Sequence, residues 1–370
     1  MNPTPLRIIL SDLHLGEGHQ QGRPNPLDDF TEDARFAELL DHWGDQATEE
    51  RPVELILNGD IVDLLKVRVR GIFPEVVDEA CALTKLERII EGHSMCFDAL
   101  KRFSASPFRR IVYLPGNHDI DLVFPMVAER IRLAMSADPS YNNVHIIRDT
   151  PVLYLDDTGV IITHGHQAEA ANAFNYDHLF IDQAGPPVLN LPWGSFFVLS
   201  VINRFKERRP HLDRVRPFAP YVIWALLFDF RFTVRFLMTC AYHIVRTRLF
   251  PSAQRKARWR TTVQLALDEF QFSPPLESYA ATLLQQSPGF HTVICGHNHR
   301  AAYHPIARGQ YWYVNTGTWG SFTTLSLRSF GTRSSYPFAL IDPSAPDAGQ
   351  PLVQLLEWRG ESRRYHNWRL

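Results

Sequence analysis

The stretch Leu114-Pro115-Gly116-Asn117-His118-Asp119 directly follows the apolar run Arg110–Leu114 and places an amide, an imidazole and a carboxylate side by side. An apolar run that stops at Pro-Gly is typical of a buried strand ending at a tight turn. Glycine allows backbone conformations and close approaches that other residues resist. A single turn of this kind occurs in many loops without a function. It indicates a functional site only if other strands of the chain end in similar polar residues.

Four further apolar runs end in the same manner. Strands are predicted at Leu6–Leu10, Val53–Leu57, Val160–Thr163 and Thr292–Cys295. The polar residues that follow the five strands, in chain order, are Asp12 with His14, Asp60, Asn117, His164, and His297 with His299. Because ligands gather at the carboxyl ends of strands in open α/β sheets, we expect these side chains to meet in one crevice.

Each fragment also has an ordinary interpretation. An aspartate such as Asp12 or Asp60 can cap a turn or a helix, and a single histidine is more often a satisfied core or surface residue than a ligand. Five fragments in order, each after an apolar strand, are hard to obtain by accident. The spacing of Asp12 and His14, and of His297 and His299, also points both side chains of each pair to one face of an extended chain. The sequence therefore predicts a metal site.

The five blocks resemble the signature of the calcineurin-like metallophosphoesterases. They are Asp12-Leu-His14, Gly59–Asp63, Gly116–Asp119, His164-Gly-His166 and Gly296–His299. The resemblance covers roughly Leu6–His166 and Thr292–Trp319, and it implies an α/β fold with a two-layer β-sandwich core flanked by helices. It also implies two divalent metals: the first is held by Asp12, His14, Asp60 and His299, and the second by Asp60, Asn117, His164 and His297. Asp60 is then the bridging carboxylate, and His166 falls outside the ligand set.

The chemistry of such a site follows from general principles. Two cations about 4 Å apart can clamp a phosphoryl group and lower the pKa of a bridging water enough to give hydroxide near neutral pH. The leaving oxygen needs a proton, and His118 is the candidate donor because imidazole titrates near neutral pH. Asp119 is the candidate to hold that imidazole. Histidine, aspartate and asparagine ligands suit Mn²⁺, Zn²⁺ or Fe better than Ca²⁺, and we take Mn²⁺ as the expected metal.

Further helices and strands are predicted around these blocks. Helical spacing occurs over Phe30–Trp43, with Asp28 or Asp29 as N-cap, over Val76–Phe103 as one long helix, and near Leu122–Met135. Short strands are predicted at Val144–Ile147 and Val152–Leu155, the latter forming a hairpin with Val160–Thr163. The tail from Tyr311 to Trp358 is predicted to be sheet.

Composition is that of a soluble globular protein. The chain has 370 residues, of which 45% are hydrophobic and 21% are charged, enough for one large domain or one domain with an insertion. The four cysteines show no paired spacing, which favours a reducing compartment. No basic-then-apolar leader precedes Leu6–Leu10, so a secretory signal is not expected and a cytoplasmic location is predicted.

We expect residues 1–166 and 291–370 to form the metallophosphoesterase core and residues 167–290 to form a mainly helical insertion. The net charge of the chain is −2, yet residues 203–260 carry 14 lysines and arginines against three acids. Tyr221–Phe250 is predicted to be helical, with Arg231, Arg235, Tyr242 and Arg246 on one side. Charged residues interrupt this run too early for a transmembrane span.

Three interpretations of the insertion stay open. It is a helical subdomain whose arginines pair with the acidic core, a lid that shapes a pocket for a substrate with apolar and anionic parts, or a surface that docks peripherally on an anionic membrane, here the inner face. The last two are compatible. A basic, aromatic segment is also an ambiguous candidate for nucleic-acid binding, which is not excluded.

Gly296–Arg300 and Val314–Trp319, with an insertion before them, look most similar to the branch that includes the UDP-2,3-diacylglucosamine pyrophosphohydrolases of lipid A synthesis. This similarity implies cleavage of a phosphodiester or pyrophosphate in a nucleotide-lipid substrate. The chain departs from the branch at His118, where arginine is usual, and its insertion is longer. A phosphomonoesterase, a cyclic-nucleotide phosphodiesterase or a nuclease could use the same blocks, whereas a non-catalytic metal-binding scaffold normally loses ligands. The sequence leaves the exact substrate, the native metal pair, the oligomeric state and the role of the Arg-rich tail Arg359–Leu370 undecided.

Overall fold

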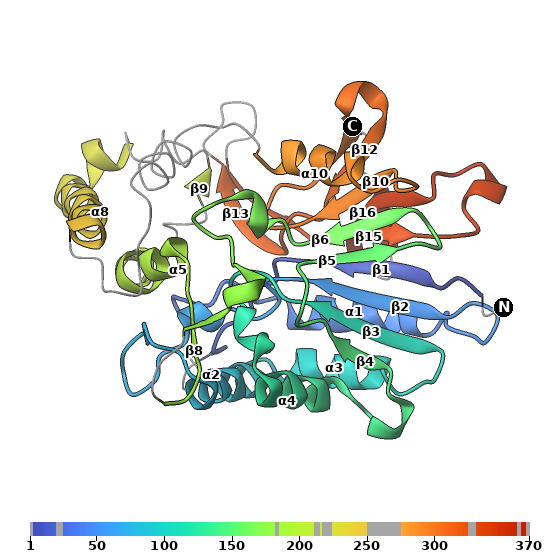
Figure 1. Cartoon of the computed structure of the whole chain (residues 1–370), viewed down its shortest axis with the longest axis horizontal. Coiled ribbons are helices and arrows are strands. Elements are labelled where there is room, and N and C mark those ends of the chain that lie inside the picture. Colours follow the sequence, from blue (N-terminus) through green and yellow to red (C-terminus); the bar gives the residue numbers. More distant parts are fainter. Residues whose placement is uncertain are drawn as a thin grey trace.

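Two β-sheets packed face to face form the centre of the computed structural model (Figure 1). The structure describes residues 3–19, 25–181, 185–210, 215–216, 224–249, 275–324, 331–360 and 364–367. The seven-stranded sheet has the order β17 (Arg364–Asn367), β16 (Val353–Gly360), β15 (Pro337–Ile341), β1 (Leu6–Leu10), β2 (Val53–Asn58), β3 (Arg109–Leu114), β4 (Val144–Ile146). The five-stranded sheet has the order β11 (Ala302–Ile306), β12 (Tyr311–Asn315), β10 (Thr292–Cys295), β6 (Val160–Thr163), β5 (Val152–Leu155).

The strands that matter for the site run in parallel. β1, β2, β3 and β4 pair in parallel, as do β6, β10 and β12. Their carboxyl ends therefore meet at one edge of each sheet. Both faces of these strands are buried, which explains why their sequences are continuous apolar runs rather than alternating ones. Ile9 points between the two sheets, whereas its neighbours Ile8 and Leu10 belong to the cluster under the helices.

Helices cover the two outer faces. The seven-stranded sheet is covered by α1 (Asp33–Gly44), α2 (Glu79–Gly92), α3 (Ser94–Phe103) and α4 (Pro125–Met135), and α10 (Pro275–Gln285) packs on β10 and β12 of the other sheet (Figure 1). Single 3₁₀ turns lie at Leu64–Lys66, Ile120–Val123, Pro139–Tyr141, His166–Ala168, Tyr176–His178, Ala307–Gly309 and Pro346–Ala348. This layering confirms the predicted two-layer core flanked by helices.

Two predicted helices differ in the structure. The single helix expected over Val76–Phe103 is broken at His93, whose backbone is not helical (φ −120°, ψ 42°). Gly92 before it packs on the backbone of Glu17, where a Cβ would lie 2.3 Å from the Glu17 carbonyl oxygen. α1 begins at Asp33 with Glu32 as N-cap, not with Asp28 or Asp29. Asp28 instead accepts hydrogen bonds from the backbone N–H of Gly18 (2.6 Å) and from His93 Nε2 (2.9 Å).

The stretch after β6 contains small elements that lie beside the core. They are β7 (Phe180–Ile181), β8 (Val188–Leu189), α5 (Trp193–Phe197), a π-helical turn (Val198–Ile202), α6 (Asn203–Lys206), β9 (Val215–Arg216) and α8 (Phe230–Leu249). β9 joins β13 (Gly320–Thr324) and β14 (Gly331–Ser335) in a small sheet. Residues 224–228 are also helical, with a break at Asp229, so the predicted helix over Tyr221–Phe250 holds for its described part; residues 221–223 and 250 lie outside it.

The division into residues 1–166, 167–290 and 291–370 stays a prediction. α10 falls within the middle range but packs on the five-stranded sheet. Among the helices of the described ranges, none is both long enough and apolar enough to cross a membrane.

Candidate metal centre

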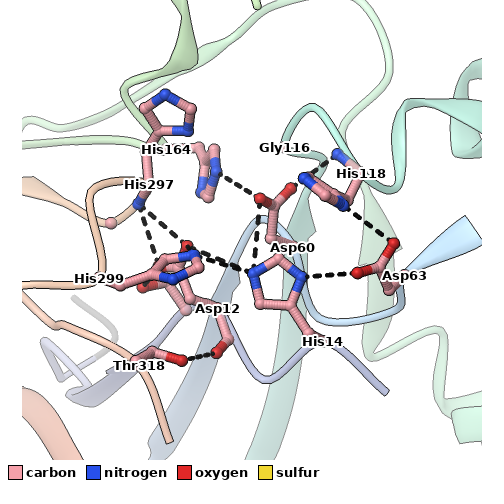
Figure 2. A network of polar contacts seen from close by, with 12 residues as sticks. Asp12, His14, Asp60, Asp63, Gly116, His118, His164, His297, His299 and Thr318 are labelled. Carbon is pink, nitrogen blue, oxygen red and sulfur yellow. Dashed lines mark hydrogen bonds and ion pairs between the residues drawn. The ribbon is translucent and has the colours of Figure 1, made fainter. Parts of the chain in front are cut away.

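The polar residues that follow β1, β2, β3, β6 and β10 face one another where the two sheets meet at their carboxyl edges (Figure 2). Their side chains fall into two groups that share Asp60. The first group consists of Asp12, His14, Asp60 and His299. The second consists of Asp60, His164 and His297, and Asn117, which the sequence predicts as its fourth member, is buried in the turn that follows β3.

The first group brings nitrogen and oxygen atoms of four side chains close together. His299 Nε2 lies 3.2 Å from Asp12 Oδ1, and His14 Nε2 lies 4.0 Å from the same oxygen and 3.9 Å from Asp60 Oδ2. The Nε2 atoms of His14 and His299 are 2.9 Å apart. His14 Nδ1 is 3.1 Å from Asp63 Oδ2. If His14 donates its Nδ1–H to that carboxylate, its Nε2 carries a lone pair toward the group.

The second group is more deeply buried. His164 Nδ1 donates to the carbonyl oxygen of Asn58 at 2.8 Å, so in the neutral imidazole, the form that binds a metal, Nε2 carries the lone pair, 3.1 Å from Asp60 Oδ2. Burial lowers the pKa of His164, but Asp60 and Asp12 outweigh it and raise the pKa to about 10, so metal binding must displace a proton from this nitrogen. His164, His297 and Asp60 offer atoms that lie within 4.8 Å of one another. Asn117 lies between Gly116 and His118, and the backbone N–H of His118 donates to Asp60 Oδ1 at 2.8 Å.

The donor atoms of both groups fit cations. His164 Nε2 and Asn117 Oδ1 are buried without a hydrogen-bond partner. Two imidazole nitrogens facing each other at 2.9 Å, and a lone pair facing a carboxylate oxygen, are arrangements that a positive ion between the atoms would satisfy. Oxygen and imidazole donors of this kind suit Mn²⁺, Zn²⁺ or Fe.

Backbone conformation supports the same conclusion. Asp12, His14, Asp60, His297 and His299 all have φ between 54° and 70°, in the left-handed region that residues other than glycine rarely adopt. Such residues cost of order 1–3 kcal/mol each and cluster at functional sites. Gly116, in the turn that follows β3, allows a close approach here, because a Cβ on it would lie 2.3 Å from Asp60 Oδ1.

The imidazole of His118 is held by Asp63 and not by Asp119. His118 Nδ1 donates to Asp63 Oδ1 at 2.9 Å (Figure 2). Burial opposes the charged imidazolium, but the carboxylates of Asp63 and Asp60 outweigh it and raise the pKa of His118 to about 9. The expected contact from Asp119 is therefore wrong. Asp119 accepts from Tyr113 Oη at 2.6 Å and from the backbone N–H groups of Gly116 and Ile61, so it braces the turn from behind.

Sequence reasoning missed two residues that contact the candidate ligands. Asp63 ends the second block and has no place in the predicted site, although it contacts both His14 and His118. Glu169 Oε2 lies 2.9 Å from His297 Nε2, and no periodic signal in the sequence points to it. His166 is buried, its two ring nitrogens form no hydrogen bond, and burial holds its pKa well below the usual range. Its place outside the predicted ligand set stays a prediction.

A cavity of about 470 Å³ opens beside the first group. His14, His118 and His299 line it, together with the charged residues Lys66, Arg300 and Asp29. Its apolar wall consists of Leu13, Val198, Ile202, Ala301, Trp319 and Pro337. Val198 and Ile202 belong to the π-helical turn, so the stretch predicted as an insertion contributes directly to this wall.

One buried ion cluster connects that stretch to the core. Lys206 Nζ in α6 lies 2.6 Å from Asp29 Oδ1, and Lys66 Nζ lies 2.5 Å from Asp29 Oδ2 and 2.8 Å from Asp63 Oδ2. Asn203 Nδ2 donates to the Leu65 carbonyl at 2.9 Å. The Lys206 side chain is fully buried. These contacts hold Val198 and Ile202 against the cavity.

Comparison with known proteins identifies the class. The model of the calcineurin-like phosphoesterase family matches residues 7–225, and the chain belongs to that family. It is therefore a phosphoester-hydrolysing enzyme, as the five blocks predicted.

Solved structures similar to this chain include a dimetal phosphatase from Danio rerio, with 9% identity over 91% of this chain and 95% of that chain and a TM-score of 0.34. Another is the phosphopantetheinyl hydrolase of Mycobacterium tuberculosis, with 12% identity over 86% and 91% and a TM-score of 0.29. Both likenesses are too weak to support an inference about function. No curated protein sequence matches the chain.

Proposed function

We propose that this enzyme hydrolyses a phosphodiester or pyrophosphate bond in a substrate that joins a nucleotide to a lipid, of the type of UDP-2,3-diacylglucosamine. The observation that supports this proposal is the cavity in which side chains of the candidate metal centre, the cationic Arg300 and an apolar wall come together. A nucleotide-lipid has the corresponding parts: a scissile phosphorus, further negative charge and an apolar body.

We further propose that two divalent cations, with Mn²⁺ as the expected metal, are held by Asp12, His14, Asp60 and His299 and by Asp60, Asn117, His164 and His297. When bound, such a pair supplies Lewis acidity toward the phosphoryl oxygens and an acidified water as nucleophile. The protein fixes the ligands beforehand. Asp63 and Asn58 set the orientation of His14 and His164, and backbone N–H groups of His297 and His118 hold the carboxylates of Asp12 and Asp60.

The leaving oxygen receives its proton from His118 in this proposal. His118 lines the cavity, and Asp63 engages its Nδ1, so Nε2 is the atom left to face substrate. Asp63 thereby acts as a positioning residue for both His14 and His118. Arg300, which lines the same cavity, would bind a second anionic group of the substrate, because Lys66 is already paired with Asp29 and Asp63.

The apolar wall would bind the lipid part. Trp319, Val198 and Ile202 lie on this wall, and burial of an acyl chain there contributes roughly 0.8 kcal/mol per methylene group. A small phosphomonoester would leave this surface unused. The cavity therefore favours an amphipathic phosphodiester or pyrophosphate over a small monoester.

A substrate panel tests the proposal. Purified enzyme loaded with Mn²⁺ would be given UDP-2,3-diacylglucosamine, a cyclic nucleotide, single-stranded DNA and an aryl phosphomonoester. We expect kcat/KM to be highest for the nucleotide-lipid. A higher value for any of the other three would reject the proposed substrate class while leaving the reaction type in place.

A further inference from the structure

The outward face of α8 combines apolar and basic side chains in an unusual way for a protein surface. At 100° per residue, Arg231, Arg235, Met238, Tyr242, Val245 and Arg246 fall within about 100° of one another around the helix. Met238, Tyr242 and Val245 are 68%, 64% and 50% exposed, and the three arginines are exposed as well. We call these six residues the α8 face.

The opposite side of α8 is already packed. Phe236 contacts Phe205 at a ring distance of 5.1 Å, and His243 lies 5.9 Å from Trp193 and 5.8 Å from Phe197. The helix is thus anchored through its inner side to α5 and α6. Its apolar residues on the outer side are not needed for that packing, and their exposure calls for another explanation.

Exposed apolar residues continue beyond the helix. Trp224, Leu227 and Phe228 are 54%, 71% and 77% exposed, and the rings of Trp224 and Phe228 stack. Phe230 is 62% exposed at the start of α8. In Figure 1, α8 lies at the end of the molecule opposite the N-terminus, to one side of the two sheets. Contact with a flat surface at this end would leave the sheets clear.

The positive charge of the α8 face indicates which kind of surface it binds. α8 contains no acidic residue, and Asp229, which precedes it, is paired with Arg209 at 2.7 Å. This helical face combines guanidinium groups with aromatic and aliphatic side chains. Such a combination is suited to the interface of a bilayer that contains acidic lipids. A second copy of this chain would bring arginines against arginines, and a neutral bilayer would give them no electrostatic gain.

We propose that the α8 face docks the enzyme on an anionic lipid surface. The side chains of Met238, Tyr242 and Val245 enter the interface, and Arg231, Arg235 and Arg246 pair with acidic headgroups. The inner side of α8 contacts the π-helical turn that supplies Val198 and Ile202 to the cavity. Docking therefore places the cavity near the lipid. The inference does not depend on the identity of the substrate, because lipid binding can be measured without catalysis.

Flotation with lipid vesicles tests the proposal. The Mn²⁺-loaded full-length protein is mixed with vesicles of phosphatidylcholine alone or of phosphatidylcholine with 30% phosphatidylglycerol. We expect binding to the second composition only, and weakening of that binding as salt is raised. Equal binding to both compositions, or binding to neither, would overturn the proposal.

Two paired variants locate the surface. Arg231→Gln with Arg235→Gln should weaken binding to anionic vesicles roughly 10- to 30-fold, and Met238→Ser with Tyr242→Ser should weaken it at least tenfold. Arg102→Gln with Arg110→Gln is the control for the arginine variant, and Met126→Ser with Tyr141→Ser is the control for the apolar variant. All four residues are exposed and lie outside α8. All four variants should hydrolyse a soluble aryl phosphodiester at the wild-type rate, which shows that they fold.

If the controls lose binding as much as the α8 variants, the surface is elsewhere and the proposal fails. Sedimentation of the wild-type protein gives an independent check. A dimer that the α8 substitutions convert to a monomer would assign the face to self-association instead. If a variant does not fold, binding of the wild-type protein to the two vesicle compositions decides the proposal.

Discussion

Asp60 connects the two groups of candidate ligands through a single carboxylate. Its two oxygens face different partners: Oδ1 accepts from the backbone N–H of His118, and Oδ2 lies 3.1 Å from His164 and 3.9 Å from His14. Burial would raise the pKa of this carboxyl, but the surrounding histidines hold it well below its usual range. It therefore stays ionised, as a ligand for cations must be.

Substitution of Asp60 by asparagine should remove both metals and the activity together. Asparagine has the same shape and tolerates the left-handed backbone of this position (φ 54°), so the fold should survive. Metal content measured by plasma emission spectrometry, and hydrolysis of an aryl phosphodiester, should both fall to background. Full activity in Asp60→Asn would refute the bridging role.

His118→Asn should lower turnover while metal stays bound. Proton transfer by a positioned side chain contributes typically 10²- to 10⁴-fold, so we expect kcat to fall within that range for a substrate with a basic leaving group. The loss should be smaller for a nitrophenyl leaving group, which needs little protonation. Loss of metal in this variant would show that His118 is a ligand, contrary to its assigned role.

At the scale of elements, the break between α2 and α3 places His93 between two carboxylates. Its ring nitrogens lie 2.9 Å from Asp28 Oδ2 and 2.8 Å from Asp33 Oδ1. Burial lowers the pKa of His93, but the hydrogen bonds to Asp28 and Asp33 outweigh it and raise the pKa to about 9. The imidazolium thus fastens the loop after β1 to α1 and α3.

Because the pKa of His93 is raised on folding, its contribution is complete below about pH 6.5 and is lost as pH rises through about 9. The free energy of unfolding should therefore decrease by about 3 kcal/mol between pH 6 and pH 10 because of this group. Urea unfolding across that range measures it. His93→Gln should be less stable at pH 6 and should lack this part of the slope; an unchanged slope would contradict the assignment.

Lys206 of α6 holds the π-helical turn with Val198 and Ile202 beside the cavity. Lys206→Met removes one of the cations that pair with Asp29 and should loosen the wall formed by Val198 and Ile202. We expect KM for an amphipathic substrate to rise about tenfold, with kcat on a small aryl phosphodiester kept, because loss of a buried partner is costly and local. The neighbouring exposed Arg204→Met provides the control, in which neither value should change.

The whole molecule should be stabilised by its metals. Added Mn²⁺ at 100 times its dissociation constant would stabilise the folded protein by about 2.7 kcal/mol per independent site. Thermal unfolding of the chelated protein with and without Mn²⁺ should show a higher Tm with metal. Asp60→Asn serves as the control and should show no shift; a shift of the same size in that variant would place the stabilising metal elsewhere.

Much of the fold could be predicted because buried parallel strands are short apolar runs bounded by polar turns. β1, β6 and β10 have the predicted bounds, and β2 and β3 differ by one residue. The break at His93 could not be predicted, because apolar residues keep helical spacing across it and the contact of Gly92 with Glu17 joins segments far apart in the sequence. Intrinsic helical periodicity does not encode that contact.

For the candidate site, too, some residues could be predicted from the sequence and others could not. The residues at the strand ends could be found because each follows a recognisable strand, and the structure brings them together. The contact of Asp63 with His118 could not be found, because neighbouring Asp119 offered the same chemistry at shorter sequence distance. Glu169 reaches His297 only through the tertiary fold.

The order of the strands along the chain has a consequence for biosynthesis. β10 inserts between β6 and β12, and His297 and His299 follow it, long after the other donors have been translated. A nascent chain on the ribosome therefore carries an incomplete set of chelating groups until residues 297–299 have been synthesised. The proposed metal centre can assemble only after β10 has been made and has inserted between β6 and β12.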